Sequence, residues 1–349
     1  MDKKAGEDLK TDADRIKEIL SFCGRGAGIR FAAVKPEVYE GVTELRFKTG
    51  WPPEIFYGRE CRFLSDAGEI LKTPCSGATM SREEISDIFC ALCGYSAYSH
   101  QEELGRGFIT IGGGHRVGIC GTAVYKGGRL AVMRDLTSLN IRVAREVHGA
   151  ADEIMERALA DGLCGLLISG PPCSGKTTVL RDLARQLSYG KLGRPVKTSV
   201  VDERGEIAAV WQGEPQNDMG PCCDVLNLSH KADGIEAAVR TLSPEYIICD
   251  EIGTEEDAEA ILHAANCGVS FAASIHAENE DELLKKRIAA RLLDAGIFGR
   301  IVLLKGPGRG MRILDMESAG DRVEIVGDAA GLYGLHNGGF DKISRFVTA

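Results

Sequence analysis

The sequence has no uninterrupted apolar stretch of membrane-spanning length and no excess of positive charge. Residues 1–8 are rich in charge and lack the apolar core of a secretory signal peptide, so we expect the chain to stay in the cytoplasm. A formal net charge of -9 argues against a broad basic face for nucleic acid. Aromatic residues, at 6%, are not interleaved with a basic stripe, and nucleic acid is therefore not expected as a partner.

At 349 residues the chain is too long for one ordinary core, and its pattern changes near residue 149. Upstream, a helix predicted at 81–93 and short strands, including a pair at 130–134 and 138–143, indicate a small α+β domain. Downstream, apolar strands alternate with helices, which is typical of a mostly parallel sheet in an α/β fold. We predict four parts: a helical lead-in at 1–39, the α+β domain at 40–148, an α/β domain at 149–305, and terminal strands with a glycine-rich tail at 306–349.

Twelve cysteines raise the question of disulfides or zinc. They are scattered, often within apolar runs, and we expect most of them to be buried thiols. A zinc site would have to combine the CxxC pair Cys90 and Cys93 with the adjacent cysteines 222–223. The predicted helix at 81–93 begins with a capping sequence at Ser81 and should place Cys90 and Cys93 on its apolar face, so no zinc is expected.

One segment fits the phosphate-loop pattern GxxxxGK[ST] and lies between a strand-like run at 163–168 and a helix-like run at 179–187. In such a loop, main-chain N–H groups and the positive end of a helix bind an anion. Lys176 would bridge the β- and γ-phosphates of ATP, and Thr177 would hold Mg²⁺. The alternative, a glycine-rich turn without nucleotide, would rarely have both flanks. The predicted cofactor-binding residues are Gly170, Pro171, Pro172, Cys173, Ser174, Gly175, Lys176, Thr177 and Thr178.

Two carboxylates, Asp250 and Glu251, close an apolar strand-like run at 246–249. Downstream of a phosphate loop, this arrangement indicates that Asp250 binds the Mg²⁺ shell, partly through water. Glu251 would then orient or deprotonate the attacking water. The alternative for both carboxylates is a capping role at the start of the next helix.

Two further strand-like runs end in polar residues. The run at 196–201 is followed by Asp202 and Glu203, and the run at 269–275 is followed by His276. Because parallel sheets bind ligands at the carboxyl ends of their strands, we predict catalytic roles for Glu203 and His276. His276 would sense the γ-phosphate or position the water. The alternatives are a turn requirement at Glu203 and a local hydrogen bond at His276.

Arginines are frequent near the end of the predicted α+β domain, and Arg134 and Arg142 are the catalytic candidates among them. Charge that develops on a γ-phosphoryl group during transfer is stabilised by guanidinium groups. We therefore predict that one or both of Arg134 and Arg142 reach the nucleotide's phosphates, in the same chain or from a neighbouring copy. The alternative is that each is a solvated strand residue or a local ion-pair partner.

The motifs follow one another in the order used by type II and type IV secretion ATPases, a RecA-like P-loop superfamily. Four segments resemble its Walker A, Asp box, Walker B and His box: Gly170 to Thr178, Val201 to Arg204, Asp250 to Gly253, and Ser274 to His276. Four others resemble the stage III sporulation protein AA family within that superfamily: Gly105 to Ile111, Gly113 to Gly118, Ser138 to Glu146, and Leu242 to Glu245. Together these segments span most of residues 40–305.

This resemblance implies an ATPase that uses ATP and Mg²⁺, forms a homo-oligomeric ring, a hexamer, and energises a membrane-embedded sporulation channel from the mother-cell cytoplasm. It also implies that the arginine-bearing first domain contacts nucleotide beside the second. Asp250 stands where secretion ATPases often have glycine, so the water-activating role is carried over to Glu251. Two alternatives stay open: an ATPase stimulated by nucleic acid, and a nucleotide-gated scaffold with little hydrolysis.

Overall fold

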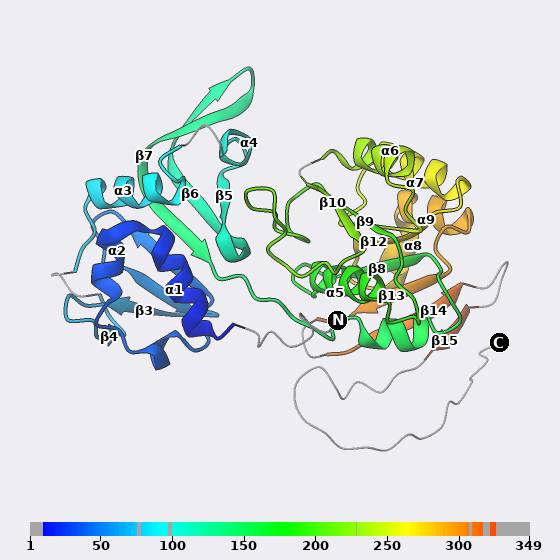
Figure 1. The fold of residues 1–349 in the computed structure, drawn as a ribbon, viewed down its shortest axis with the longest axis horizontal. Helices are drawn as coiled ribbons and strands as arrows, with labels where there is room; N and C mark the ends of the chain where they lie inside the picture. The colour runs from blue at the N-terminus through cyan, green and yellow to red at the C-terminus, as the bar shows by residue number, and fades with distance from the viewer. Residues whose placement is uncertain are drawn as a thin grey trace, which may run out of the picture. The chain divides into compact units, whose positions relative to one another are not determined.

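The computed structural model describes residues 10–74, 78–96, 100–227, 229–306, 309–316 and 322–325. The chain divides into two compact units (Figure 1). Unit 1 is formed by the chain up to Glu146 together with Ala209–Gln216, and unit 2 by Val147–Ala208 and the chain from Asn217 onward. Unit 1 therefore includes the helices expected as a separate lead-in. Among the described residues, no helix combines the length and the apolar character that crossing a bilayer requires.

Unit 1 is built on a seven-stranded sheet in the order β4-β3-β2-β1-β7-β6-β5. Neighbouring strands are antiparallel throughout. Burial alternates along β1, where Leu45 and Phe47 are buried, so one face of the sheet carries the core. The strands are β1 (Glu44–Lys48), β2 (Glu54–Tyr57), β3 (Glu60–Leu64), β4 (Ile70–Leu71), β5 (Phe108–Ile111), β6 (His115–Lys126) and β7 (Arg129–Arg142).

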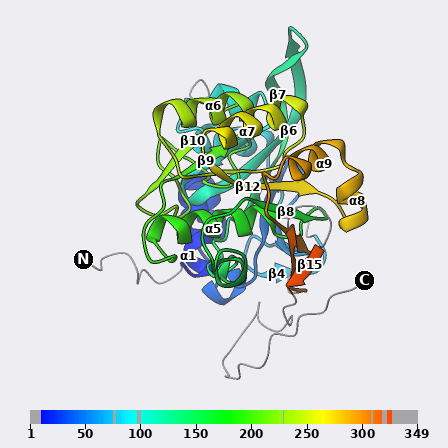
Figure 2. The ribbon, with the colours of Figure 1, turned by 90° about the vertical axis from the view of Figure 1, so that its right-hand side faces the viewer.

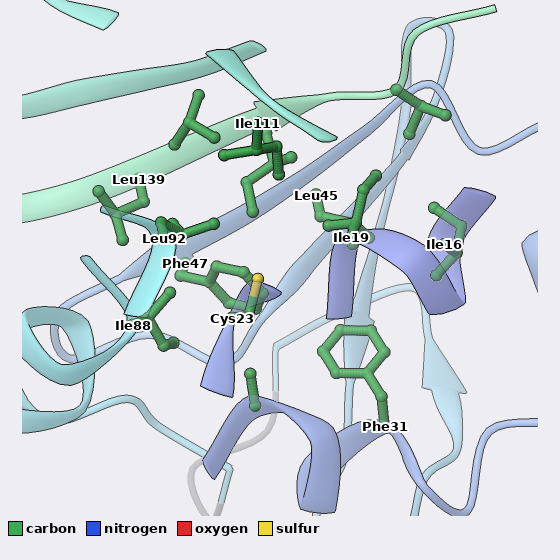
Figure 3. Packing of buried hydrophobic residues seen from close by; sticks show 14 of the residues in the cluster. Ile16, Ile19, Cys23, Phe31, Leu45, Phe47, Ile88, Leu92, Ile111 and Leu139 are labelled. Atoms are coloured by element: carbon green, nitrogen blue, oxygen red, sulfur yellow. The ribbon is translucent and has the colours of Figure 1, made fainter. Parts of the chain in front are cut away.

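The helices of unit 1 pack on the apolar face of this sheet. Figure 3 shows Ile19 and Phe31 from the first two helices in one core cluster with Phe47 of β1, and the ring centroids of Phe31 and Phe47 are 6.2 Å apart. Capping boxes at Thr11 and Ser81 fix the starts of α1 and α3, as the sequence predicts at Ser81. The helices are α1 (Asp12–Phe22), α2 (Gly24–Phe31), α3 (Arg82–Leu92) and α4 (Gln101–Leu104), with 3₁₀ turns at Pro36–Tyr39 and Gly112–Gly114.

Strands β6 and β7 form a long hairpin that extends beyond the other strands of unit 1 (Figure 1). Two strands were expected at 130–134 and 138–143, but the structure has one continuous strand with a register shift near Asp135, whose φ is 47°. A Cβ added at Gly121 would lie 2.5 Å from the main-chain oxygen of Arg134, so the strands approach too closely there for a side chain. A β-bulge therefore accommodates the polar stretch that the sequence pattern suggests as a break.

Unit 2 is built on an eight-stranded sheet in the order β10-β9-β11-β12-β8-β13-β14-β15. The pairings from β10 to β13 are parallel, and β14 and β15 are added antiparallel at one edge. The sequence gives no signal for β10, a partly exposed edge strand. The strands are β8 (Leu166–Gly170), β9 (Thr198–Asp202), β10 (Cys223–Asn227), β11 (Tyr246–Cys249), β12 (Ser270–His276), β13 (Arg300–Leu304), β14 (Met311–Met316) and β15 (Arg322–Ile325).

Helices cover both faces of the unit 2 sheet (Figure 2). One face packs against α6, α7 and α9 through side chains such as Ile235, Ile261 and Leu292, and α5 lies on the opposite face. All residues of β8, β9 and β11 are buried, as expected for parallel strands covered on both sides. The helices are α5 (Lys176–Tyr189), α6 (Lys231–Thr241), α7 (Glu255–Asn266), α8 (Glu280–Lys285) and α9 (Arg287–Asp294), with a π-helical turn at Ile154–Ala158.

The segment Ala209–Gln216 follows β9 in the chain and belongs to unit 1 by its contacts. Trp211 packs edge-on against Phe22, with the ring centroids 5.4 Å apart. The main-chain N–H of Gly113 donates to Gln216 Oε1 at 2.8 Å. Gly113 has a φ of 76°, so this turn favours glycine. The glycine run at 112–114 is thus explained by turn conformation and by contact with this segment.

The burial of the cysteines differs from the expectation. Cys93 is buried, and burial raises the pKa of its thiol to about 11, but Cys90 is exposed. At about 100° per helical residue, Cys90 lies roughly 140° around α3 from Ile85, well off the buried stripe. Cys120 is also exposed, and the prediction that most cysteines are buried is wrong for the described residues. All of the described cysteines are free thiols.

Candidate nucleotide site

Four neighbouring parallel strands of unit 2, β9, β11, β12 and β8, end at the same edge of the sheet. The phosphate loop follows β8, Glu203 follows β9, Asp250 and Glu251 follow β11, and His276 ends β12. The strand register places His276 beside Gly170. The structure therefore brings the unit 2 candidates together where parallel α/β sheets bind ligands.

The phosphate loop has a backbone conformation suited to an anion. Gly175 and Cys173 are left-handed, with φ of 98° and 60°. A Cβ added at Gly170 would lie 2.6 Å from Ser174 Oγ, so a side chain there would close the loop. Ser174 Oγ is buried and has no hydrogen-bond partner among the described residues. This orphaned hydroxyl beside the amino end of α5 fits a phosphate oxygen.

Lys176 is the first residue of α5, and its side chain is buried against the loop. Its Nζ donates to the main-chain oxygen of Gly170 at 2.8 Å and lies 3.0 Å from His276 Nδ1. Burial lowers the pKa of Lys176 below its ordinary value, while the carboxylates of Asp250 and Glu251 act in the opposite direction. The ammonium is therefore placed where it can exchange a carbonyl partner for a phosphate.

Thr177 and Asp250 form a pair of oxygen ligands suited to Mg²⁺. Thr177 Oγ1 donates to Asp250 Oδ2 at 2.7 Å, across the space between the loop and β11. Ser274 Oγ of β12 donates to the other carboxylate oxygen of Asp250 and fixes its orientation. A hydroxyl and a carboxylate beside a phosphate site form the donor set that Mg²⁺ uses in phosphate-loop proteins, so the residues fit this ion.

Glu251 has an uncommon backbone conformation and a well-defined environment. Its φ is 47°, a left-handed value that costs a non-glycine residue about 1–3 kcal/mol. Its N–H donates to Ser274 Oγ at 2.9 Å, and its carbonyl oxygen accepts from Lys231 Nζ at 2.6 Å. Its carboxylate lies 2.5 Å from Arg204 Nη1 and 3.6 Å from His276 Nε2. Strain held in this way is a feature of functional sites.

Asp202 and Glu203, the two acidic residues at the end of β9, have different environments. The carboxylate of Asp202 is buried and accepts from three main-chain N–H groups of residues 206–208, each at 2.9 Å. Burial raises the pKa of Asp202, although these three hydrogen bonds oppose the rise. Glu203 instead faces the site, where its carboxylate lies 3.3 Å from Lys231 Nζ and 3.5 Å from His230 Nδ1. Asp202 therefore shapes the loop, and Glu203 remains the functional candidate.

Three side chains of the site have no role assigned from the sequence, although Ser274 and Arg204 lie within the segments that resemble the His box and the Asp box. Ser274 lies two positions before His276 on β12, so strand alternation could have placed both on one face. Arg204 directly follows Glu203 at a strand end, which is a weaker signal. Lys231 begins α6 after a long loop, and no motif spacing indicates it.

The two arginine candidates belong to unit 1. Arg142 pairs across the sheet with Glu44 of β1 and with Arg116 of β6, and Arg134 pairs with Thr122 of the projecting hairpin. Both Arg134 and Arg142 are exposed. Their role at a nucleotide therefore stays a prediction.

A mostly parallel sheet, a phosphate loop after one strand and carboxylates after its neighbours define a RecA-like P-loop fold. Two solved structures share it. The pilus retraction motor PilT, solved with bound ADP, has a TM-score of 0.55 and 16% identity, covering 80% of each chain. The ATPase DotB of Legionella pneumophila has a TM-score of 0.50 and 16% identity, covering 92% of this chain and 82% of DotB. At this identity the likeness shows the fold, and it confirms the predicted fold class.

The chain belongs to the family described as "Sporulation stage III, protein AA", whose sequence profile matches residues 13–323. Stage III sporulation protein AA of Bacillus subtilis (strain 168) is 39% identical over 308 residues, covering 87% of this chain and 95% of the relative. The resemblance found in the sequence motifs is thereby confirmed.

Proposed function

We propose that the chain is a Mg²⁺-dependent ATP hydrolase. The observation that carries the proposal is the convergence of a buried lysine, the Thr177–Asp250 pair and the constrained Glu251 around one phosphate loop. The structural neighbours support it, since DotB is described as an ATPase and PilT as a motor whose structure contains ADP.

The residues divide the reaction between them. Lys176 and the main-chain N–H groups of the loop bind the β- and γ-phosphates, and Thr177 and Asp250 hold Mg²⁺. When bound, this ion supplies positive charge that neutralises the phosphates. Glu251 takes a proton from the attacking water at a carboxylate oxygen. Arg204 and His276 orient that carboxylate, and Glu203 adds a second acidic group nearby.

We further propose that copies of the chain assemble into a ring, a hexamer, that energises a membrane-embedded sporulation channel from the mother-cell cytoplasm. Family membership and the likeness to a pilus motor support this extension. Arg134 and Arg142, exposed on β7, would supply guanidinium charge to nucleotide in the same chain or a neighbour.

Replacing Glu251 by glutamine tests the hydrolase assignment. Glu251→Gln keeps the size of the side chain but removes the proton acceptor, so turnover of ATP with Mg²⁺ should fall about 10²-fold or more. ATP affinity should stay within about twofold, since Glu251 is not assigned to phosphate binding. Glu256→Gln, exposed in the first turn of α7, is the matched control and should leave turnover unchanged.

Turnover of Glu251→Gln at the wild-type rate would contradict the assignment. Wild-type protein that binds ATP but does not turn it over, with or without its membrane partner, would favour the nucleotide-gated scaffold instead. Salt-sensitive stimulation of turnover by single-stranded nucleic acid would favour the nucleic-acid-dependent alternative.

A further inference from the structure

Lys231 is a buried lysine whose position no local preference explains. Its side chain is 4% exposed. It is the first residue of α6, where the helix dipole disfavours a positive charge. Burying an ammonium group is also costly unless it is paired. The two local costs imply that Lys231 stays there because of its contacts with other elements.

Lys231 Nζ joins three elements at the edge of the sheet. It donates to the main-chain oxygen of Glu251 after β11 at 2.6 Å. It lies 3.3 Å from Glu203 Oε2 after β9, and 3.6 Å from Asp257 Oδ2 in the first turn of α7. Asp257 in turn accepts from the N–H groups of Gly253 and Thr254, and so holds the loop between β11 and α7. One ammonium therefore connects both acidic candidates to the cap of α7.

Lys231 contacts the backbone of Glu251 and not its carboxylate. The left-handed φ of Glu251 is unfavourable by itself and persists only where surrounding groups over-determine it. Lys231 holds the carbonyl of Glu251, and Ser274 Oγ holds its N–H. These two bonds lie on either side of the Cα and together fix the direction in which the side chain leaves the chain.

The start of α6 is itself held close to β9. A Cβ added at Gly234 would lie 2.6 Å from Val201 Cγ1 and 3.0 Å from Ser229 Oγ, so glycine permits this approach. Lys231, one turn earlier, is therefore carried on a rigidly packed helix start rather than on a mobile surface loop. A group so placed can hold a neighbouring backbone with little freedom.

We propose that Lys231 is a positioning residue for the hydrolytic reaction: it holds the backbone of Glu251 left-handed and keeps Glu203 beside it, so that the carboxylate of Glu251 faces the attacking water. The inference rests on the proposed ATP hydrolysis and deepens it. Lys231 does not contact nucleotide in this account. Its loss should therefore impair the chemical step and leave ATP binding intact.

The test compares Lys231→Met, Lys231→Arg and the control Lys197→Met in the full chain. Lys197 has an exposed side chain at the opposite end of the β9 region, so its replacement should change nothing. For Lys231→Met we expect single-turnover hydrolysis to fall about 10²-fold, while the dissociation constant for ATP stays within about twofold. Lys231→Arg retains the positive charge, so its single-turnover rate should be about tenfold higher than that of Lys231→Met.

A second readout does not depend on hydrolysis. Amide hydrogen exchange of the peptide covering residues 250–257 should become at least about tenfold faster in Lys231→Met, because the Glu251 peptide is no longer held on both sides. Exchange in β8 and β12 should stay unchanged. Wild-type protein without ATP turnover would contradict the proposed function, yet this exchange result would still support the positioning role.

Combining substitutions separates positioning from general destabilisation. If Lys231 acts through Glu251, then adding Lys231→Met to Glu251→Gln should lower turnover by less than about twofold further. The inference would be overturned if the turnover losses of the two single variants multiplied in the double variant. It would also be overturned if ATP affinity, turnover and unfolding temperature all fell in parallel in Lys231→Met. Unchanged exchange at 250–257 would also overturn it. If Lys231→Met does not fold, Lys231→Arg carries the same comparison with smaller changes.

Discussion

The two units use different sheets, and the difference decides how their polar residues are arranged. In unit 2 the parallel strands β8, β9, β11 and β12 end at one edge, so residues distant in sequence converge, such as Lys176 and His276. In unit 1 the strands are antiparallel, and charged residues along them pair with residues two positions away, as Arg46 does with Glu44 on β1 and Arg62 with Glu60 on β3. Convergence at a strand edge is therefore the reason that the proposed nucleotide site lies in unit 2.

The largest effect should come from the cation of the phosphate loop. Lys176→Ala should lower ATP turnover about 10³-fold or more, because one buried donor to the phosphates is lost. Steady-state phosphate release by the full chain with Mg²⁺ measures this effect. Lys197→Ala, exposed in the same unit, is the control. If Lys176→Ala turned over ATP at the wild-type rate, the nucleotide site would not lie at the phosphate loop of unit 2.

The free energy of unfolding should depend on pH through a buried histidine of unit 1. Burial is the main cause that lowers the pKa of His115 from 6.5 to about 4, and Arg15 and Lys10 add to it while Glu18 opposes it. Between these values the unfolded chain binds a proton that the folded chain does not, so stability is lost as the pH falls from 6.5 to 4. The loss should reach roughly 3 kcal/mol.

His115→Asn removes this titration and leaves an oxygen to accept from the N–H of Ala144, which donates to His115 Nδ1 at 2.9 Å. The difference in unfolding free energy between wild type and variant should therefore change between pH 6.5 and 4. The exposed His263→Asn should leave the pH dependence as in wild type. An equal slope in all three proteins would contradict the buried neutral state of His115.

Two buried serines of unit 2 should behave differently. Ser274→Ala leaves the N–H of Glu251 without its acceptor and removes the donor to Oδ1 of Asp250, whose Oδ2 still accepts from Thr177, so the protein should lose about 1–3 kcal/mol and turnover should also fall. Ser199 is equally buried, but its Oγ has no hydrogen-bond partner among the described residues, so Ser199→Ala should be nearly neutral. Denaturant unfolding measures both, and equal losses would show that burial alone matters.

The smallest expected effects distinguish the proposed catalytic arginines of unit 1 from a structural one. Arg134→Ala and Arg142→Ala should each lower turnover about tenfold if, as proposed, both guanidinium groups stabilise charge on the γ-phosphoryl group. Their exposure predicts stability changes within about 0.5 kcal/mol. Arg145→Ala should do the reverse and cost about 1–2 kcal/mol, since Arg145 donates twice to Asp12 and once to Val42. Equal turnover losses in all three variants would contradict a catalytic role for Arg134 and Arg142.

Much of the unit 2 site could be predicted because its residues directly follow apolar strands. Glu203, Asp250 and His276 each stand at such an end, and parallel topology brings strand ends together. Lys231 could not be found in this way, because it reaches the site from a helix start and its partners are known only once α6 has packed on β9. Its contact is tertiary and leaves no spacing in the sequence.

The fold shows the same limit. In unit 1, α1 and α3 begin at capping boxes and burial alternates along β1, whereas the bulge at Asp135 joins two predicted strands into one. The segment Ala209–Gln216 belongs to unit 1 through contacts such as that of Trp211 with Phe22. Such docking depends on the complementarity of two surfaces, which local propensity does not encode.

The most direct test of the central claim is a structure of the full chain with Mg²⁺ and a slowly hydrolysed ATP analogue. We predict the triphosphate within Gly170–Thr178, the ion on Thr177 and Asp250, and Lys176 Nζ moved from the carbonyl of Gly170 onto phosphate. The carboxylate of Glu251 should face the γ-phosphate. An empty loop with the nucleotide bound elsewhere would contradict the account.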